Sequence, residues 1–420
     1  MPIVIDNGSA MMKAGHAGEG LPRSLFPTMV ARHIGELPPS DVNFYVREYY
    51  VGHVALNVQN VRIFYPIEKS IITDWCSMEQ VWEYVFDPDL RTNPHEHPVL
   101  LTESPQNPSL NREKMAEIFF EKFDVPAIAI VSSAALSLIA SGRTTGLIVD
   151  MGAGGTNIVP IYDNLALNHA KKWLNINGRD ITEYISGLIS QRTEYSFSSL
   201  RELEIVADIK ERLGYIALDP EREEINVRQY ILPDGEVINL GVERFLAPEV
   251  LFNPAAIDLD CKPLHEAINN CIQKCEVNIQ QEIYENIILS GGSSMFPGLK
   301  ERLQKELTAM VSETIKVRVI APPERMYLAW IGGSILASQP FSSKLWLWKE
   351  DYKKHGARLA RQGIYSKLFS SKIEQEIELS PIPIDSQHCP LCGNRGIIAG
   401  QEIKARKEIL GCLSCANRIL

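Results

Sequence analysis

The sequence predicts an α/β protein of two large lobes, each built on a β-hairpin whose turn is rich in glycine. The chain has 420 residues and a mass of 47.1 kDa, which is too much for one hydrophobic core and suits two lobes. Strands alternate with helices along it, as is typical of α/β architecture. The glycine-rich hairpin occurs twice, far apart in the sequence, and this repetition indicates a duplicated fold with a nucleotide held between the halves.

The first hairpin lies at the N-terminus. An apolar strand runs into Asp6, a turn around Gly8 follows, and a second strand leads out to Gly15. Glycine adopts backbone angles that point several amides at one place, and such a cup of amides binds phosphate. A carboxylate beside the cup suits a hydrated Mg²⁺. For a single hairpin, a tight structural turn is the commoner explanation.

Alternating strands and helices follow the first hairpin. Residues 31–65 mix polar, aromatic and β-branched types and predict a small subdomain. From Pro66 to Val85 the apolar spacing is helical. A strand at 97–103, an amphipathic helix at 111–123, a strand at 125–131 and a helix at 134–140 are predicted next.

The second hairpin, residues 147–160, has Asp150 before a turn that contains three glycines. It begins the second lobe, about residues 141–326, in which helices are predicted at 178–189, 202–213 and 263–279 and from 298. A strand at 286–289 breaks at Gly291-Gly292 before the last of these helices. Such a junction between a strand and a helix is a third candidate ligand-binding position. An apolar helix is predicted at 327–337.

Composition narrows the class of protein. Charged residues make up 22% of the chain and apolar ones 45%, with a net charge of −10, the balance of an ordinary globular protein. A nucleic-acid-binding role would therefore be confined to a patch. The uncharged stretch 125–142 contains Pro126 and four serines, so we expect a buried strand and helix rather than a membrane span. Nothing demands an oxidising compartment, which favours the cytoplasm, with the nucleus as the alternative.

The C-terminal residues predict a linker and a zinc ribbon. Residues 370–388 contain two prolines and are typical of an extended linker. Residues 389–420 hold two Cys-x-x-Cys pairs, a spacing that predicts one structural Zn²⁺. The four zinc ligands are Cys389, Cys392, Cys412 and Cys415. Disulfides or free thiols are the alternative.

Five basic and two acidic side chains give this ribbon a charge of +3. Such a charge suits either nucleic acid or an acidic protein surface. Zinc ribbons are often protein-docking modules, and contact with nucleic acid is expected only through this segment.

Several blocks carry a family resemblance. Besides the first hairpin, they are Glu96–Glu103, Asn111–Met115, Ala140–Gly146, Leu289–Gly292, Ala321–Arg325 and Trp330–Ser338. In these blocks, and in their order over roughly residues 1–365, the sequence resembles actin and the actin-related proteins. The resemblance implies a ribonuclease H-like body, residues 1–369, of four subdomains around a cleft that holds ATP or ADP with Mg²⁺.

The resemblance also implies a set of site residues. Asp6 and Asp150 match the aspartates that hold Mg²⁺ through water. Ser9, Lys13 and the amides of the two turns match phosphate contacts, and the remaining positions lie around the nucleoside. The implied nucleotide contacts are Asp6, Gly8, Ser9, Ala10, Met11, Lys13, Asp150, Gly152, Ala153, Gly154, Gly155, Thr156, Gly178, Lys210, Glu211, Gly291, Gly292, Ser293, Phe296 and Met326.

Departures from the family pattern bear on hydrolysis. Ser133 occupies the place of a water-positioning glutamine, and Asn157 that of a histidine. Hydrolysis of a bound triphosphate depends mostly on positioning a water and stabilising charge. A serine is too short to hold the water where a glutamine would, so we predict weakened hydrolysis. Compensation by neighbouring polar groups is the alternative.

Two functions follow as expectations. The first is a cytoskeletal or filament-associated ATP-binding protein that assembles with itself or with other actin-family subunits and docks partners through the ribbon. The second is a non-polymerising scaffold subunit of a larger complex, such as a chromatin remodeller. The near-complete body favours the first, whereas the ribbon and the replaced glutamine and histidine favour the second. The sequence blocks that resemble actin disfavour a sugar kinase or a chaperone-type ATPase.

Overall fold

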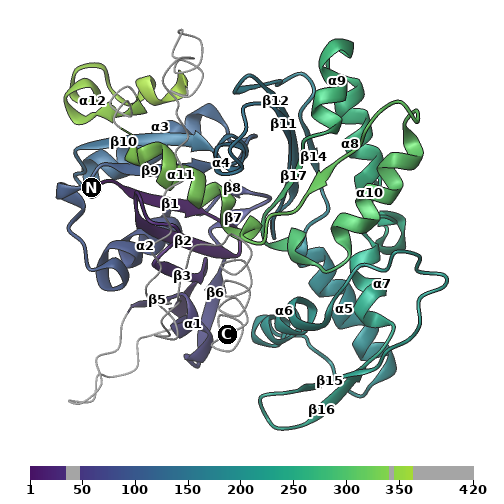
Figure 1. The fold of residues 1–420 in the computed structure, drawn as a ribbon. Coiled ribbons are helices and arrows are strands. Elements are labelled where there is room, and N and C mark those ends of the chain that lie inside the picture. The colour runs from purple at the N-terminus through teal and green to yellow at the C-terminus, as the bar shows by residue number, and fades with distance from the viewer. Residues whose placement is uncertain (35–47, 340–344, 363–420) are drawn as a thin grey trace, which may run out of the picture. The chain divides into compact units, whose positions relative to one another are not determined.

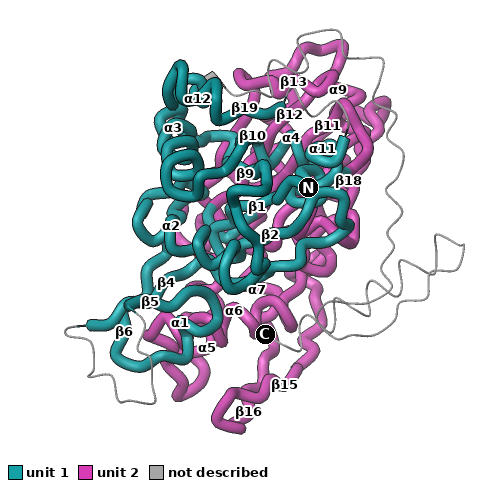
Figure 2. Tube along the Cα trace, turned by 90° about the vertical axis from the view of Figure 1, so that its left-hand side faces the viewer, with its two compact units in different colours: residues 1–140, 152–154, 329–379 teal, residues 141–151, 155–328, 380–420 magenta. Residues whose placement is uncertain are grey.

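The computed structural model of the protein describes residues 1–34, 48–339 and 345–362. The predicted linker and zinc ribbon lie outside these residues. The chain divides into two compact units, coloured separately in Figure 2. The first holds Met1–Ala140, Gly152–Gly154 and the segment that begins at Ala329, and the second holds Ser141–Met151 and Gly155–Leu328.

The first unit is built on a mixed sheet in the order β19-β10-β9-β1-β2-β3. The labels from β10 to β3 follow this order in Figure 1. Its strands are β1 (Ile3–Asn7), β2 (Met11–His16), β3 (Ser24–Pro27), β9 (Val99–Glu103), β10 (Ala127–Ser132) and β19 (Leu347–Trp348). Strands β1, β9 and β10 are parallel, whereas β1, β2 and β3 form an antiparallel meander. The carboxyl ends of parallel strands meet at one edge of a sheet, where ligands bind in open α/β sheets.

Helices flank this sheet and bury its apolar side chains. They are α2 (Trp75–Tyr84), α3 (Ser109–Glu117), α4 (Ser133–Ala140), α11 (Leu328–Ser338) and α12 (Lys349–His355), with shorter helical turns η1 (Val85–Leu90), η2 (Pro94–Glu96), η3 (Ile118–Lys122) and η8 (Ala357–Gln362). Trp82 and Phe119 are fully buried and meet edge to face, with ring centroids 4.9 Å apart. The uncharged stretch 125–142 forms β10 and α4, which confirms the expected buried strand and helix.

A three-stranded antiparallel sheet forms within residues 30–64. It consists of β4 (Val30–His33), β5 (Tyr49–Val51) and β6 (Val61–Phe64), with α1 (His53–Asn57) between the last two. After it comes a short hairpin of β7 (Ile67–Glu68) and β8 (Ile71–Ile72). The helix predicted from Pro66 therefore begins only at Trp75, where the side chain of Asp74 accepts a hydrogen bond from the Ser77 amide.

The second unit repeats the sheet topology of the first. Its strands are β11 (Gly146–Met151), β12 (Thr156–Tyr162), β13 (Leu165–Ala166), β14 (Lys172–Leu174), β17 (Ile287–Ser290) and β18 (Val319–Ile320). They lie in the order β13-β12-β11-β17-β18, with β14 also paired to β12. An antiparallel hairpin is again followed by two parallel strands, as in β2-β1-β9-β10. The predicted duplication is thus confirmed at the level of sheet topology.

The remaining elements of the second unit surround this sheet. They are α5 (Gly178–Arg192), α6 (Leu200–Leu213), α7 (Glu243–Glu249), α8 (Leu264–Gln273), α9 (Val277–Tyr284) and α10 (Leu299–Met310), a hairpin of β15 (Arg228–Ile231) and β16 (Val237–Leu240), and the turns η4 (Pro254–Ile257), η5 (Gly292–Met295) and η6 (Arg325–Tyr327). Capping boxes at Asn177 and Ser199 fix the starts of α5 and α6.

The single helix predicted at 263–279 is wrong. Helix α8 ends at Gln273 and α9 starts at Val277, because Glu276 between them has an extended backbone (φ −59°, ψ 138°). In the described part of the chain, no helix combines the length and the apolar character needed to cross a membrane.

Candidate nucleotide site

The turn between β1 and β2 presents a paired carboxylate and ammonium. Asp6 and Lys13 are opposed residues of the hairpin, and the Lys13 Nζ donates to Asp6 Oδ2 over 2.8 Å. Asp6 is 7% exposed and Lys13 9%. Burial strengthens the attraction within such a pair and also makes the loss of either partner costly. The hairpin thus holds one negative and one positive group beside its glycine turn.

Thr102 at the end of β9 anchors this carboxylate from the neighbouring parallel strand. Its Oγ1 donates to Asp6 Oδ1 over 2.7 Å and accepts from the Asn7 amide over 2.9 Å. The Asn7 side chain in turn donates to the Thr102 carbonyl and accepts from the Trp82 indole. Both oxygens of Asp6 therefore accept hydrogen bonds, so its orientation is set before any ligand arrives.

Gly8 is required by close approach at the turn. A Cβ on this residue would overlap the Met11 carbonyl oxygen and lie 3.3 Å from Lys13 Nζ. Thr28 braces the turn by donating its hydroxyl to the Gly8 carbonyl over 2.7 Å. Of the other turn residues predicted to contact phosphate, Ser9 is 9% exposed and Ala10 is exposed. The turn is thus braced by Thr28, and the Lys13 ammonium lies beside it.

The tip of the second glycine turn belongs to the first unit, together with Ser9. The unit includes Gly152–Gly154. A Cβ on Gly154 would lie 2.5 Å from Ser9 Oγ and 2.8 Å from the backbone nitrogen of Ser70 in the β7–β8 turn. Only a glycine allows this approach. Ser9 and Gly154, which the sequence places in separate predicted phosphate loops, are therefore neighbours in the fold.

Ser133 is the first residue of α4, directly after β10. Its strand neighbour Ser132 is opposite Glu103 in the parallel β9–β10 pairing, so both residues end at the edge where β1 presents Asp6. Glu103 is buried and is held by Arg112, whose Nε lies 2.7 Å from Glu103 Oε2. The structure thus places Ser133, which stands where the resemblance implies a water-positioning glutamine, at the carboxyl edge of the sheet.

In the second unit, Asp150 lies in a row of opposed residues that crosses three strands. It is opposite Asn157 on β12 and Ser290 on β17. A Cβ on Gly291 would overlap the Met151 carbonyl and lie 2.8 Å from Asp150 Oδ1, and the φ of Gly291 is +86°. Glycine is therefore needed at 291 both for its backbone angle and for the space beside Asp150.

The loop after Gly291 is closed by hydrogen bonds. The Gly291 amide donates to the Arg325 carbonyl over 2.9 Å, and the Arg325 Nε donates to the Ser294 carbonyl over 3.1 Å. Burial lowers the pKa of the Arg325 guanidinium from its usual value. Met326 follows Arg325 in η6 and Ser293 lies in η5, so both predicted contacts belong to the two turns that these bonds join.

Lys210 is buried against the start of α5. Its Nζ donates to the Gly178 carbonyl over 3.0 Å and to Thr182 Oγ1 over 2.8 Å. Burial lowers the pKa of the Lys210 ammonium. Glu211, the next residue, is exposed. The structure therefore brings the predicted residues Gly178 and Lys210 together. Although Glu211 is partly in contact with solvent, burial of its carboxyl raises the pKa of that group.

Phe296 lies beside the end of α6. A Cβ on Gly214 would come within 2.9 Å of Phe296 Cε1, and Phe296 is 7% exposed. Gly214 follows the helix that carries Lys210, and its amide donates to the Lys210 carbonyl over 2.9 Å. The aromatic ring and the lysine are thus on adjoining segments of the second unit.

Several features of the described residues fit a magnesium nucleotide. Glycines 8, 154 and 291 lie so close to other protein atoms that a Cβ at any of them would overlap a neighbour, and glycine turns of this kind direct backbone amides at phosphate oxygens. Asn157 is 4% exposed and its Oδ1 has no hydrogen-bond partner among the described residues. Among the residues that the structure describes, no group of three or more His, Cys, Asp or Glu side chains could hold a metal. Water-mediated binding of Mg²⁺ by two aspartates requires no such group. The four cysteines predicted to bind zinc lie outside the described residues.

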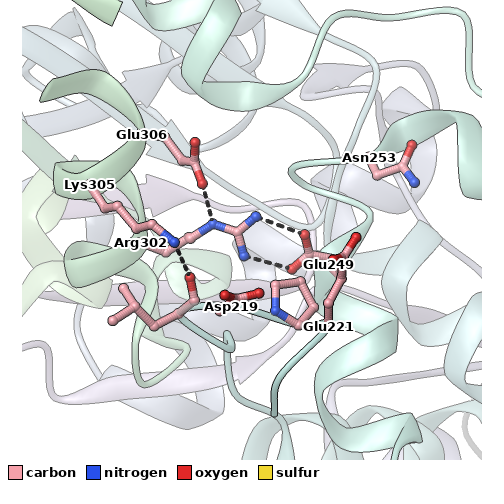
Figure 3. Close-up of a pocket in the computed structure, with 9 residues that line it drawn as sticks. Asp219, Glu221, Glu249, Asn253, Arg302, Lys305 and Glu306 are labelled. Atoms are coloured by element: carbon pink, nitrogen blue, oxygen red, sulfur yellow. Dashed lines mark hydrogen bonds and ion pairs between the residues drawn. The ribbon is translucent and has the colours of Figure 1, made fainter. Parts of the chain in front are cut away.

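Figure 3 shows a different feature, a polar hollow of about 480 Å³ around Arg302. The guanidinium pairs with Glu249 over 3.1 Å and with Glu306 over 2.6 Å, and lies 4.6 Å from the ring centre of Phe252. Burial raises the pKa of Glu249 even though Arg302 opposes the shift. Arg302 pairs with both carboxylates, so the cluster links α7 to α10 and has a structural role.

Sequence reasoning missed Thr102, Ser70 and Trp173. Thr102 orients Asp6, the Ser70 amide approaches Gly154, and Trp173 is opposite Asn157. A polar residue at the end of a buried strand was a signal for Thr102. The other two depend on β7, β8 and β14, which are too short to give a clear alternation pattern.

Comparison with protein-family models gives one finding. The model described as Actin matches residues 1–364. The match covers both units and ends before the predicted linker.

Proposed function

The chain belongs to the actin family, and we propose that it is an actin-related protein that binds ATP or ADP with Mg²⁺, hydrolyses ATP weakly and acts in or on a filament. The observation that carries the proposal is the repeated carboxylate and glycine turn. Asp6 is oriented by Lys13 and Thr102, and Asp150 lies against Gly291 in a second sheet of the same topology.

The phosphates would be held by backbone amides and one lysine. The glycine turns at Gly8 and Gly154 would direct backbone amides at phosphate oxygens, and Lys13 Nζ lies beside the first turn. Ser9, next to Gly154, contributes a hydroxyl, and the neighbouring residues Ala10, Met11, Gly152, Ala153, Gly155 and Thr156 contribute backbone amides. Such groups bind phosphate oxygens because the amide dipoles and the ammonium converge on one place. Asp6 and Asp150 would hold Mg²⁺ through water, and the metal would neutralise phosphate charge.

The nucleoside would occupy the second unit. Gly178 on α5 and Lys210 on α6 are joined by a hydrogen bond, and Phe296 lies beside Gly214 at the end of α6. Glu211 is exposed beside them and suits hydroxyl groups of a ribose. Gly291, Gly292, Ser293 and Met326 belong to the adjoining loops. An aromatic ring beside polar groups is the kind of slot that a nucleoside requires.

Weak hydrolysis follows from Ser133 and Asn157. Ser133 starts α4 at the carboxyl edge of the first sheet, and its short side chain reaches less far than a glutamine. Asn157 is buried and neutral, so it supplies no imidazole to accept or relay a proton. A positioned acid or base contributes typically a factor of about 10² to 10⁴ in rate. Both changes therefore slow phosphate release without removing the groups that bind ATP.

We also propose that residues 389–420 bind one Zn²⁺ through their four cysteines and dock a protein partner. Two Cys-x-x-Cys pairs complete a tetrahedral site. The net charge of +3 suits an acidic surface, whereas the whole chain has a charge of −10. A non-polymerising scaffold subunit of a larger complex remains the competing role, favoured by this ribbon.

The discriminating experiment is high-speed sedimentation of the full chain with Mg-ATP, alone and mixed with purified actin. A pellet that requires ATP and contains this chain supports the filament role. If the chain stays soluble with ATP bound in both samples, the filament role is wrong and the scaffold role stands. A chain that binds no ATP contradicts both.

A further inference from the structure

Two buried polar atoms of opposite kind occur together in the second unit. The Asn157 Oδ1, an acceptor, and the Trp173 Nε1, a donor, are each buried without a hydrogen-bond partner among the described residues. Asn157 is 4% exposed. A buried polar atom without a hydrogen-bond partner destabilises the folded state. Two such atoms in one place therefore point to a group that satisfies both.

The two side chains lie on the same face of the sheet. Asn157 on β12 is directly opposite Trp173 on β14, and directly opposite Asp150 on β11. Side chains of opposed residues project to one face, with Cβ atoms about 5 Å apart. Asp150, Asn157 and Trp173 thus form a row across three strands. The flanking residues Val149, Met151, Ile158 and Leu174 belong to the hydrophobic core on the other face.

Gly155 makes room for the indole. A Cβ on this residue would overlap Trp173 Nε1, and lie 3.1 Å from Trp173 Cε2. Gly155 is two residues before Asn157 on the same chain segment, so the indole N–H is directed at the stretch that leads from the glycine turn into Asn157. Any larger residue at 155 would exclude the ring from this position.

We propose that Trp173 and Asn157 share one buried water, and that Trp173 is a positioning residue for Asn157. The water accepts a hydrogen bond from the indole N–H and donates one to the Asn157 Oδ1. Water suits this place because it is both donor and acceptor, and buried waters typically bridge such atoms. The bond holds the Asn157 amide in one of its two orientations beside Asp150. Its effect on phosphate release rests on the function proposed above, whereas the water site does not.

The first test uses nucleotide-free protein labelled with ¹⁵N. The chain has six tryptophans, and W173F identifies the Trp173 indole signal by removing it. We expect a cross-relaxation peak between this N–H and a bound water, and its loss in N157A. Trp348, which is 40% exposed, supplies the control W348F, which leaves the Trp173 signal unchanged. A Trp173 N–H with no bound-water contact, or one whose contact survives in N157A, overturns the water site.

The second test measures ATP affinity and phosphate release separately. We expect W173F to lower the rate of phosphate release about fivefold, the equivalent of one ordinary hydrogen bond, with ATP affinity unchanged. The variant N157A should lower the rate by a similar factor, and W173F/N157A should lower it no further, because both changes break the same bridge. If the two effects multiply, Trp173 acts independently of Asn157 and the positioning role is wrong. If wild-type protein binds no ATP, the proposed function fails, while the first test still judges the water site.

Discussion

The Lys13 ammonium donates to the Asp6 carboxylate over 2.8 Å across the first hairpin, and the two residues are opposed in its register. The hairpin therefore fixes the position of a cation beside the Gly8 turn, because the strand pairing sets which residue is opposite the aspartate. Thr102 holds the second oxygen of the same carboxylate. This arrangement yields the first prediction.

Replacing Lys13 should weaken ATP binding. In K13M the phosphates lose one charged hydrogen bond, worth about 1.5–3 kcal/mol, which corresponds to at least about a tenfold rise in the dissociation constant for ATP. Equilibrium titration with Mg-ATP measures it. Lys114 on α3 is exposed in its pair with Glu117, so K114M is the matched control and should bind normally. Equal affinity in K13M and wild type would contradict the assignment of Lys13.

Two adjacent glycines offer a sharper comparison. Gly291 has φ +86° and its Cβ would overlap the Met151 carbonyl, whereas a Cβ on Gly292 has nothing within 4 Å. We expect G291A to lower the free energy of unfolding by at least about 1 kcal/mol and to weaken ATP binding, because the carboxylate of Asp150 must move. The variant G292A should leave the free energy of unfolding nearly unchanged and should weaken ATP binding less than G291A, because its Cβ meets no neighbouring atom. Denaturant titration and ATP titration of both variants check this, and similar behaviour of the two would refute it.

His265 should make stability depend on pH. Its ring stacks on Phe252, and burial lowers its pKa from the usual value of 6.5. As pH falls below 6.5, the unfolded chain takes up a proton more readily than the folded chain, so the folded state loses stability. Denaturation at pH 7.5 and pH 5.5 should show a smaller loss in H265F than in wild type.

A second histidine variant controls for the loss of an imidazole. His169 is exposed, and H169F should keep the wild-type dependence on pH. If H265F and H169F lose the same free energy of unfolding as wild type between the two pH values, burial of His265 does not contribute.

The C-terminal cysteines should account for bound zinc. We expect one Zn²⁺ per chain by elemental analysis and none in C412S/C415S, because two thiolates cannot complete the tetrahedron. Cys76 is exposed in the described body, and C76S should retain the metal. Full zinc content in C412S/C415S would exclude the predicted ligand set.

Much of the fold was predictable because its signals are local. The two hairpins show apolar strands that end in an aspartate and a glycine turn, and both form as predicted. The helix predicted at 263–279 failed because apolar spacing continues across Glu276, where only the backbone angles reveal the break. The helix predicted at 111–123 instead comprises α3 and the wider turn η3, which together cover 109–122.

The candidate site was predictable in part. The two glycine turns could be predicted because glycines that follow an apolar strand indicate a turn, and both hairpins form. The contact of Ser9 with Gly154 required residues 145 positions apart to meet. The β7–β8 turn was missed because Lys69 and Ser70 adopt positive φ without a glycine or asparagine to signal it. Trp173 was missed because its role depends on pairing between β12 and β14.

The most direct test of the central claim follows the nucleotide that stays on the protein. The full chain is loaded with Mg-ATP, free nucleotide is removed, and bound ATP, bound ADP and released phosphate are measured over time. We expect ATP to remain the bound species in wild type. In S133Q/N157H, which restores the two replaced side chains, we expect ATP to bind equally and to release phosphate at least about tenfold faster. Wild-type protein that carries no nucleotide, or that converts its ATP to ADP as fast as the double variant, would contradict the account.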